Sequence, residues 1–159
     1  MKIIDLRSDT VTLPTSEMMD AINSATLGDD VYVEDSSTIE LENLAANITG
    51  KEAGLLVSSG TMGNLISCLV HSSRGTEAIM GHKSHIFLYE SGGISSYGGI
   101  HSHQLKNNDN GTIDIDMIKD AIRIDDVHFP VTSLICLENT HNKCHGFPLE
   151  LDYINSVCD

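Results

Sequence analysis

The chain has little positive charge. Its 159 residues include nine lysines and arginines against 23 aspartates and glutamates, a formal net charge of −14 at pH 7. A surface this negative repels phosphate backbones and anionic lipid headgroups, so nucleic acid and membrane surfaces are disfavoured as partners. The sequence also lacks a run of about 20 apolar residues that would cross a bilayer, and its first residues lack an apolar signal-peptide core. These absences predict a cytoplasmic protein.

Cysteine and proline are also scarce. The four cysteines form no CxxC pair, and the chain is too long for a small disulfide scaffold, so we expect free thiols. With three prolines and 40% hydrophobic residues, the chain can bury a core, which argues against disorder. Its length is typical of a single domain of roughly 100–200 residues.

The apolar residues that are present predict alternating helices and strands. Helical spacing and capping residues indicate helices over 16–25, 37–49, 62–71, 115–122 and 149–158, with a helical turn at 86–88. For the second of these helices, Ser37 is the predicted cap and Gly50 the predicted stop. Short apolar runs predict strands at 53–57, 78–80, 101–105 and 131–137, and the glycine- and serine-rich segment 90–99 is predicted to be a flexible loop. This order predicts an α/β fold with a mostly parallel sheet flanked by helices, and a chain that ends before the next strand.

A turn of small residues precedes the helix 62–71. Gly60 allows close approach of a ligand to the backbone, and Thr61 offers a hydroxyl donor. The N–H groups and dipole at the start of a helix favour an anion, so this turn is a candidate phosphate site. Because the turn matches neither a P-loop nor a GxGxxG motif, the residues alone favour a simple strand-to-helix turn.

Two other patterns are ambiguous. The segment Asp5–Pro14 is predicted to be an extended arm with a buried arginine, Arg7. By spacing alone, this arm is explained by hydrogen bonds that hold it in place, without a functional role. Among eight histidines, the pair His101 and His103 and the group His141-x-x-Cys144-His145 have spacings that zinc can use. These residues lie in separate segments without an HExxH motif, so we assign no metal ligand, and a metal-dependent hydrolase is the least favoured alternative.

Five segments, taken together, resemble one family. They are Asp5–Thr12, Gly28–Tyr32, the turn Ser59–Thr61 with Asn64, Asp126–Phe129 and Leu137–Asn142. In order and spacing they resemble the low-specificity L-threonine aldolases, pyridoxal-phosphate enzymes within the β-eliminating lyase family. The resemblance implies the large domain of the aspartate-aminotransferase-like fold. Residues 1–15 would be an N-terminal arm and residues 16–159 the N-terminal part of that domain, with the C-terminal small domain absent.

The resemblance also implies roles for individual residues. Gly60 and Thr61 would hold the phosphate of pyridoxal 5'-phosphate, and His85 would stack on its pyridine ring. Ser8 would help to hold the substrate carboxylate, and His128 would approach the substrate hydroxyl. His85 and His128 are therefore the candidate catalytic bases, since histidine titrates near neutrality.

The implied reaction is retro-aldol cleavage of a β-hydroxy-α-amino acid. L-Threonine or L-allo-threonine would give glycine and acetaldehyde, in a homo-oligomer (a dimer or tetramer) when full length. The family's cofactor-binding lysine falls beyond Asp159 in this resemblance, and none of the six lysines takes its place, so we expect the isolated chain to be inactive. The alternative is a non-catalytic short form that binds the cofactor phosphate or pairs with another subunit.

Overall fold

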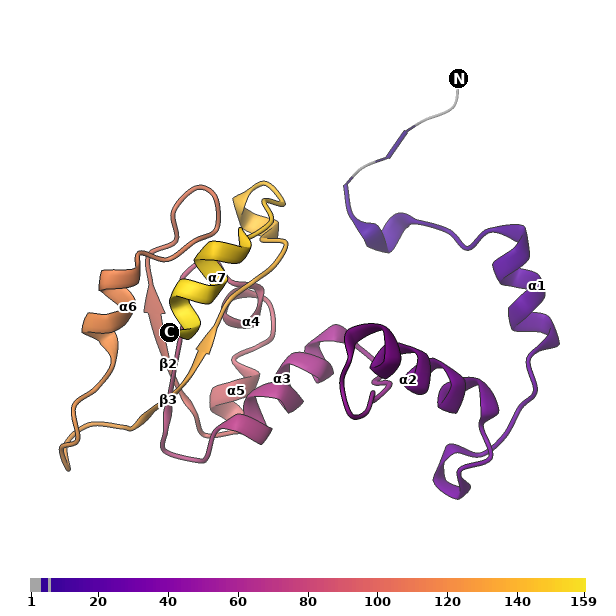
Figure 1. Cartoon of the computed structure of the whole chain (residues 1–159), viewed down its shortest axis with the longest axis horizontal. Helices are drawn as coiled ribbons and strands as arrows, with labels where there is room; N and C mark the ends of the chain where they lie inside the picture. Colours follow the sequence, from indigo (N-terminus) through magenta and orange to yellow (C-terminus); the bar gives the residue numbers. More distant parts are fainter. Residues whose placement is uncertain (1–3, 6) are drawn as a thin grey trace. The chain divides into compact units, whose positions relative to one another are not determined.

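The computed structural model describes residues 4–5 and 7–159 (Figure 1). Lys2, one of the six lysines, lies outside the described residues. So does Leu6, which belongs to the segment Asp5–Thr12. The chain divides into two compact units, residues 1–56 and 57–159. Within the described part, no helix has the length and apolar character needed to cross a membrane.

The first unit contains the two predicted helices. Its elements are η1 (Asp9–Val11), α1 (Ser16–Ser24), η2 (Asp30–Tyr32) and α2 (Ser36–Thr49). Thr15 caps α1 by accepting a hydrogen bond from the Met18 N–H at 3.3 Å, and Gly50, with φ +65°, ends α2 as predicted. The predicted cap of α2 at Ser37 is wrong, because Asp35 caps this helix through the Thr38 N–H.

Other predictions for this unit are also wrong. Arg7 is not buried: its side chain is 79% exposed and pairs with Asp5. The apolar run at 53–57 forms no strand, because the Leu56 N–H bonds the Glu42 side chain at 2.7 Å instead of a neighbouring strand. Of the residues described in this unit, Ala46 alone is buried.

The second unit contains a small parallel sheet. Its strands are β1 (Glu77–Gly81), β2 (His101–Leu105) and β3 (Thr132–Cys136), in the order β2-β1-β3. Each lies where the sequence predicted a strand. The other elements are α3 (Gly60–His71), α4 (His85–Leu88), α5 (Gly93–Ser96), α6 (Ile115–Ala121), η3 (Asn142–Cys144) and α7 (Leu151–Cys158).

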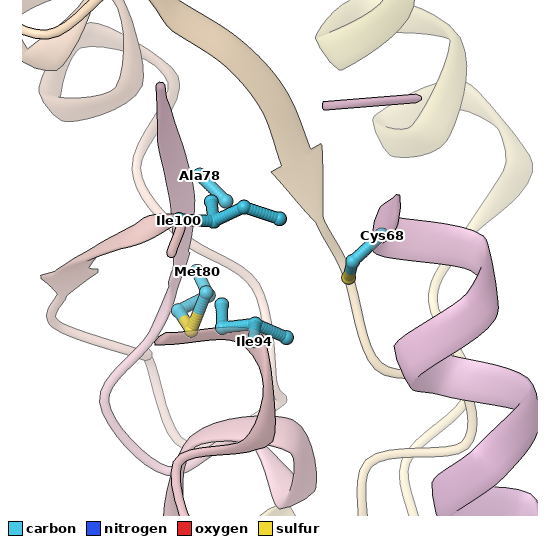
Figure 2. Close-up of a cluster of buried hydrophobic side chains, with 5 residues drawn as sticks. All are labelled: Cys68, Ala78, Met80, Ile94 and Ile100. Atoms are coloured by element: carbon cyan, nitrogen blue, oxygen red, sulfur yellow. The ribbon is translucent and has the colours of Figure 1, made fainter. Parts of the chain in front are cut away.

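Alternating side chains of β1 divide the core into two layers. Ala78 and Met80 pack on one face with Cys68 of α3 and with Ile94 and Ile100, as Figure 2 shows. The opposite face is covered by residues of α6 and α7 that pack around Ile79 and Leu105 of the sheet. The loop predicted at 90–99 contains the short helix α5, because its buried Ile94 belongs to the first layer.

A buried carboxylate lies at the amino end of β1. Glu77 is fully buried and accepts hydrogen bonds from His103 Nδ1 at 3.0 Å and Arg123 Nε at 3.2 Å, with His101 Nε2 at 3.5 Å. Burial raises the pKa of Glu77, but the bonds from His103 and Arg123 outweigh it and lower the pKa. Both histidines of the candidate zinc pair thus face this glutamate. In the described part of the chain, no group of three or more His, Cys, Asp or Glu side chains is placed to hold a metal ion.

Candidate functional site

The carboxyl ends of β1 and β3 open a crevice in the second unit. The chain leaves β1 toward α4 and α5 on one face of the sheet, whereas it leaves β3 toward α7 on the other. Ligands of open α/β sheets bind at such a divergence. Glu138 bridges it: its carboxylate accepts from the His85 N–H at 2.6 Å and from the Asn142 N–H at 2.9 Å. The adjacent His141 is fully buried, with Nδ1 3.8 Å from Glu138.

His85 is held at this crevice by its side chain as well. It begins α4, directly after the loop that follows β1. Its Nδ1 lies 2.8 Å from Glu90 Oε1, and the Asn64 side-chain amide donates to the same oxygen at 2.7 Å. The Glu90 side chain is 3% exposed, whereas that of His85 is 44% exposed. The imidazole is therefore anchored at Nδ1, while the side chain as a whole remains partly accessible.

Gly60 and Thr61 form the first turn of α3, two residues earlier than the predicted helix start. Ser59 caps the helix by accepting from the Met62 N–H at 3.1 Å. A Cβ built on Gly60 would meet no atom within 4 Å, so the backbone is open to a ligand there. Among the described residues, none accepts a hydrogen bond from the Gly60 or Thr61 N–H. These donors and the helix dipole fit a phosphate group.

A cavity of about 460 Å³ lies between α3 and the end of β3. Its wall on α3 begins at Asn64, one turn after Gly60, and it also includes His85 and Glu138. Cys68 and Cys136 line it as well. The neighbouring Cys68 thiol and burial both raise the pKa of Cys136, which keeps that thiol neutral rather than nucleophilic. The volume is within the range of small-molecule sites.

His128 lies away from this cavity. It precedes β3, and the parallel pairing of β3 with β1 places that end of the sheet opposite the crevice. The neighbouring Phe129 ring contacts Arg123, 5.4 Å from its centroid, and Arg123 in turn bonds Glu77. The His128 side chain is 84% exposed, and hydrogen bonds from its N–H and ring lower the pKa of Asp126. The structure therefore does not bring His128 to His85 within one chain.

Ser8 belongs to the first unit and is described by itself. Its hydroxyl caps η1, accepting from the Thr10 N–H at 3.2 Å and from the Thr10 hydroxyl at 2.9 Å. The residue is exposed, so the hydroxyl has access to solvent.

Two residues of the crevice were not singled out from the sequence. Glu90 and Glu138 are two of 23 acidic residues, and neither stands in a motif with His85. One signal was available for Glu138, because it directly follows a predicted buried strand, where ligand-binding side chains of parallel sheets gather. Glu90 had no comparable signal, since its partners are brought to it by the fold: Asn64 of α3 and His85 of α4.

The residues present fit pyridoxal phosphate in part. The open first turn of α3 offers donors to a phosphate, and the accessible imidazole of His85 offers a surface to an aromatic ring. Gly60, Thr61 and His85 are the residues that could hold such a group.

Comparison with known proteins shows the family of the chain. The beta-eliminating lyase family model matches residues 5–159. A probable low-specificity L-threonine aldolase 2 of Arabidopsis thaliana is 51% identical over 99% of this chain and 45% of its own length. The low specificity L-threonine aldolase of Escherichia coli (strain K12) is 43% identical over 98% of this chain and 46% of its own. The chain thus spans about 45% of the length of these relatives. By this match, the chain belongs to the beta-eliminating lyase family.

Proposed function

We propose that this chain supplies the phosphate-binding and ring-binding part of a pyridoxal-phosphate-dependent aldolase. The reaction is cleavage of a β-hydroxy-α-amino acid, with L-threonine or L-allo-threonine giving glycine and acetaldehyde. The observation that carries the proposal is the anchored His85, which lies at the carboxyl ends of β1 and β3 and is tied through Glu90 to the helix that starts at Gly60.

Each residue contributes a distinct interaction. The N–H groups of Gly60 and Thr61 and the Thr61 hydroxyl bind the cofactor phosphate. When bound, the cofactor would supply an electron sink for the electron pair of the Cα–Cβ bond. His85 covers the ring and, through Nε2, accepts the proton of the substrate hydroxyl as general base. The resemblance alone would assign Ser8 the role of a hydrogen-bond donor to the substrate carboxylate.

His128 takes part through a second copy of the chain in this proposal. One sheet separates His128 from His85 within a chain, so His128 would reach the substrate hydroxyl only from a neighbouring subunit. This assignment requires a homo-oligomer, as the resemblance implies. The exposure of His128, 84% for its side chain, leaves it available for such an approach.

In this proposal, none of the six lysines of the chain takes the place of the lysine that binds the cofactor covalently. Lys143 contacts Tyr89, whose ring contacts the His85 imidazole: the Lys143 Nζ lies 5.3 Å from the ring centroid of Tyr89. The interaction with Tyr89 raises the pKa of Lys143, which keeps the amine protonated and a poor nucleophile. We therefore propose that the 159-residue chain does not cleave threonine by itself. Borohydride trapping with peptide mapping tests this, and a pyridoxyl group on Lys83 or Lys143 would contradict it.

Equilibrium dialysis tests the phosphate site directly. We expect the chain to retain pyridoxal phosphate in preference to pyridoxal, because the two differ only in the phosphate. Thr61→Val should weaken retention about tenfold, the effect of one hydrogen bond to a charged group. Thr49→Val, at the last residue of α2, is the matched control and should leave the retention unchanged. Equal retention of the two compounds would overturn the proposal.

A further inference from the structure

We propose that Glu90 is the positioning residue of His85: it holds the neutral imidazole in the form protonated at Nδ1 and leaves Nε2 as the proton acceptor. This inference rests on the proposed function for the use made of Nε2. The arrangement of the two side chains themselves does not depend on any cofactor.

The geometry around Glu90 leaves a single hydrogen-bonding pattern. Its side chain is 3% exposed, and one oxygen, Oε1, receives both His85 Nδ1 at 2.8 Å and the Asn64 amide at 2.7 Å. A carboxylate only accepts hydrogen bonds, so the imidazole nitrogen that faces it must carry a hydrogen. In the neutral ring, the other nitrogen then has a free lone pair.

The remaining neighbours of His85 do not determine which ring nitrogen carries the hydrogen. Glu138 binds the backbone N–H of His85 and not its ring. Tyr89 contacts the imidazole as a tilted ring, with centroids 5.5 Å apart. Among the described residues, none forms a hydrogen bond with Nε2. Nε2 is thus the ring nitrogen left without a partner, on a side chain that is 44% exposed.

Glu90 also connects two parts of the proposed site. Asn64 lies one turn after Gly60 and Thr61 on α3, and the same carboxylate oxygen binds both Asn64 and His85. Movement of the imidazole away from this oxygen would leave a buried carboxylate with one donor fewer, which is costly. The orientation of His85 is therefore fixed relative to the helix that would bind the phosphate.

The protonation of each imidazole nitrogen can be read by long-range ¹H–¹⁵N NMR of the full 159-residue chain. The titration should end at about pH 9, where an ordinary imidazole is neutral. We expect the tautomer of the neutral His85 ring with its proton at Nδ1 to outnumber the Nε2–H tautomer about tenfold or more. A hydrogen bond to a charged acceptor confers a preference of this size. The His85→Asn variant assigns the signals. A neutral ring protonated mainly at Nε2 would overturn the proposal.

Two variants separate positioning from a merely structural role. Glu90→Leu removes the acceptor, so the preference for Nδ1–H should fall about tenfold, whereas Glu90→Gln keeps an amide oxygen at the same reach and should restore part of it. His103, whose Nδ1 lies 3.0 Å from Glu77, is the internal reference and should not change. The exposed Glu52→Leu is the matched control. An unchanged His85 tautomer in a folded Glu90→Leu chain would contradict the proposal. If that variant does not fold, the spectrum of the unmodified chain still decides.

The outcome is independent of pyridoxal phosphate binding. A selected Nδ1–H form together with failed dialysis would refute the proposed function and support the role of Glu90. An unselected tautomer together with phosphate-dependent retention would refute the role of Glu90 alone.

Discussion

The two units of the chain differ sharply in how they bury their apolar side chains. In the second unit, three parallel strands collect two layers of buried residues, including the fully buried Ile79 and Met80. In the first, among its described residues, two capped helices bury Ala46 alone, while Met18, Ile22 and Leu44 are each more than half exposed. Local signals thus suffice to form helices, whereas the sheet supplies the tertiary burial that positions His85.

Truncation of a core side chain should produce the largest difference between the units. Ile79→Ala removes a side chain buried between β1 and α6, and we expect a loss of about 2–5 kcal/mol in the free energy of unfolding. Leu44→Ala, on the exposed face of α2 with Leu44 56% exposed, should change it by less than about 0.5 kcal/mol. Urea titration followed by circular dichroism measures both. Equal losses would show that the first unit is packed as tightly as the second.

Glu77→Gln should give the next largest loss in the free energy of unfolding. Glu77 is fully buried with Arg123 and His103 as partners, and loss of its charge leaves Arg123 without a counterion. We expect a loss of about 3 kcal/mol at pH 7 by urea titration. In the first unit, the corresponding Arg7→Ala breaks an exposed ion pair with Asp5 and should have no measurable effect.

Lowering the pH should also remove the contribution of Glu77 to stability. The folded-state pKa of Glu77 is lowered, so its stabilising contribution is fully present above the ordinary glutamate pKa of about 4.3 and is lost as the pH falls toward the lower folded value. A stability profile measured from about pH 7 to pH 3 should therefore be flatter below about pH 4.3 in Glu77→Gln than in the unmodified chain. Parallel profiles in that window would contradict the pairing. Arg123, His101 and His103 are the charged or titratable groups that face Glu77.

Removal of a helix cap should have the smallest effect and the most local one. Ser59 caps α3 and Thr15 caps α1 through equivalent bonds to a backbone N–H, and loss of either should cost about 1 kcal/mol. We expect Ser59→Ala to lower global stability, because α3 is packed on the sheet. Thr15→Ala should only accelerate amide hydrogen exchange within α1. Faster exchange throughout the second unit of Thr15→Ala would show that the units unfold together.

The sequence was sufficient where one local pattern decides the structure. The strands at 78–80 and 101–105 and the stop of α2 at Gly50 are confirmed. The apolar run at 53–57 has the same pattern as a strand, yet it is unpaired because its backbone bonds Glu42. Such a choice of partner depends on tertiary contacts that periodicity does not contain.

The motifs of the candidate site were predictable from the sequence, whereas the hydrogen bonds that join its residues were not. The first turn of α3 and His85 could be singled out by resemblance, but the bond from the His85 N–H to Glu138 joins residues 53 positions apart in the sequence. The position of His128 followed in principle from the strand order, because it precedes β3 whereas His85 follows β1. In a parallel sheet, these two places lie at opposite ends.

We propose above all that the second unit carries the phosphate-binding and ring-binding residues. Amide chemical-shift mapping of the ¹⁵N-labelled chain during titration with pyridoxal phosphate tests it most directly. We predict saturable shifts at Gly60 and Thr61 and at His85, which begin α3 and α4, and that inorganic phosphate reproduces those of Gly60 and Thr61 alone. Saturable shifts confined to residues 4–56, or no saturable shift at Gly60 and Thr61, would contradict the account.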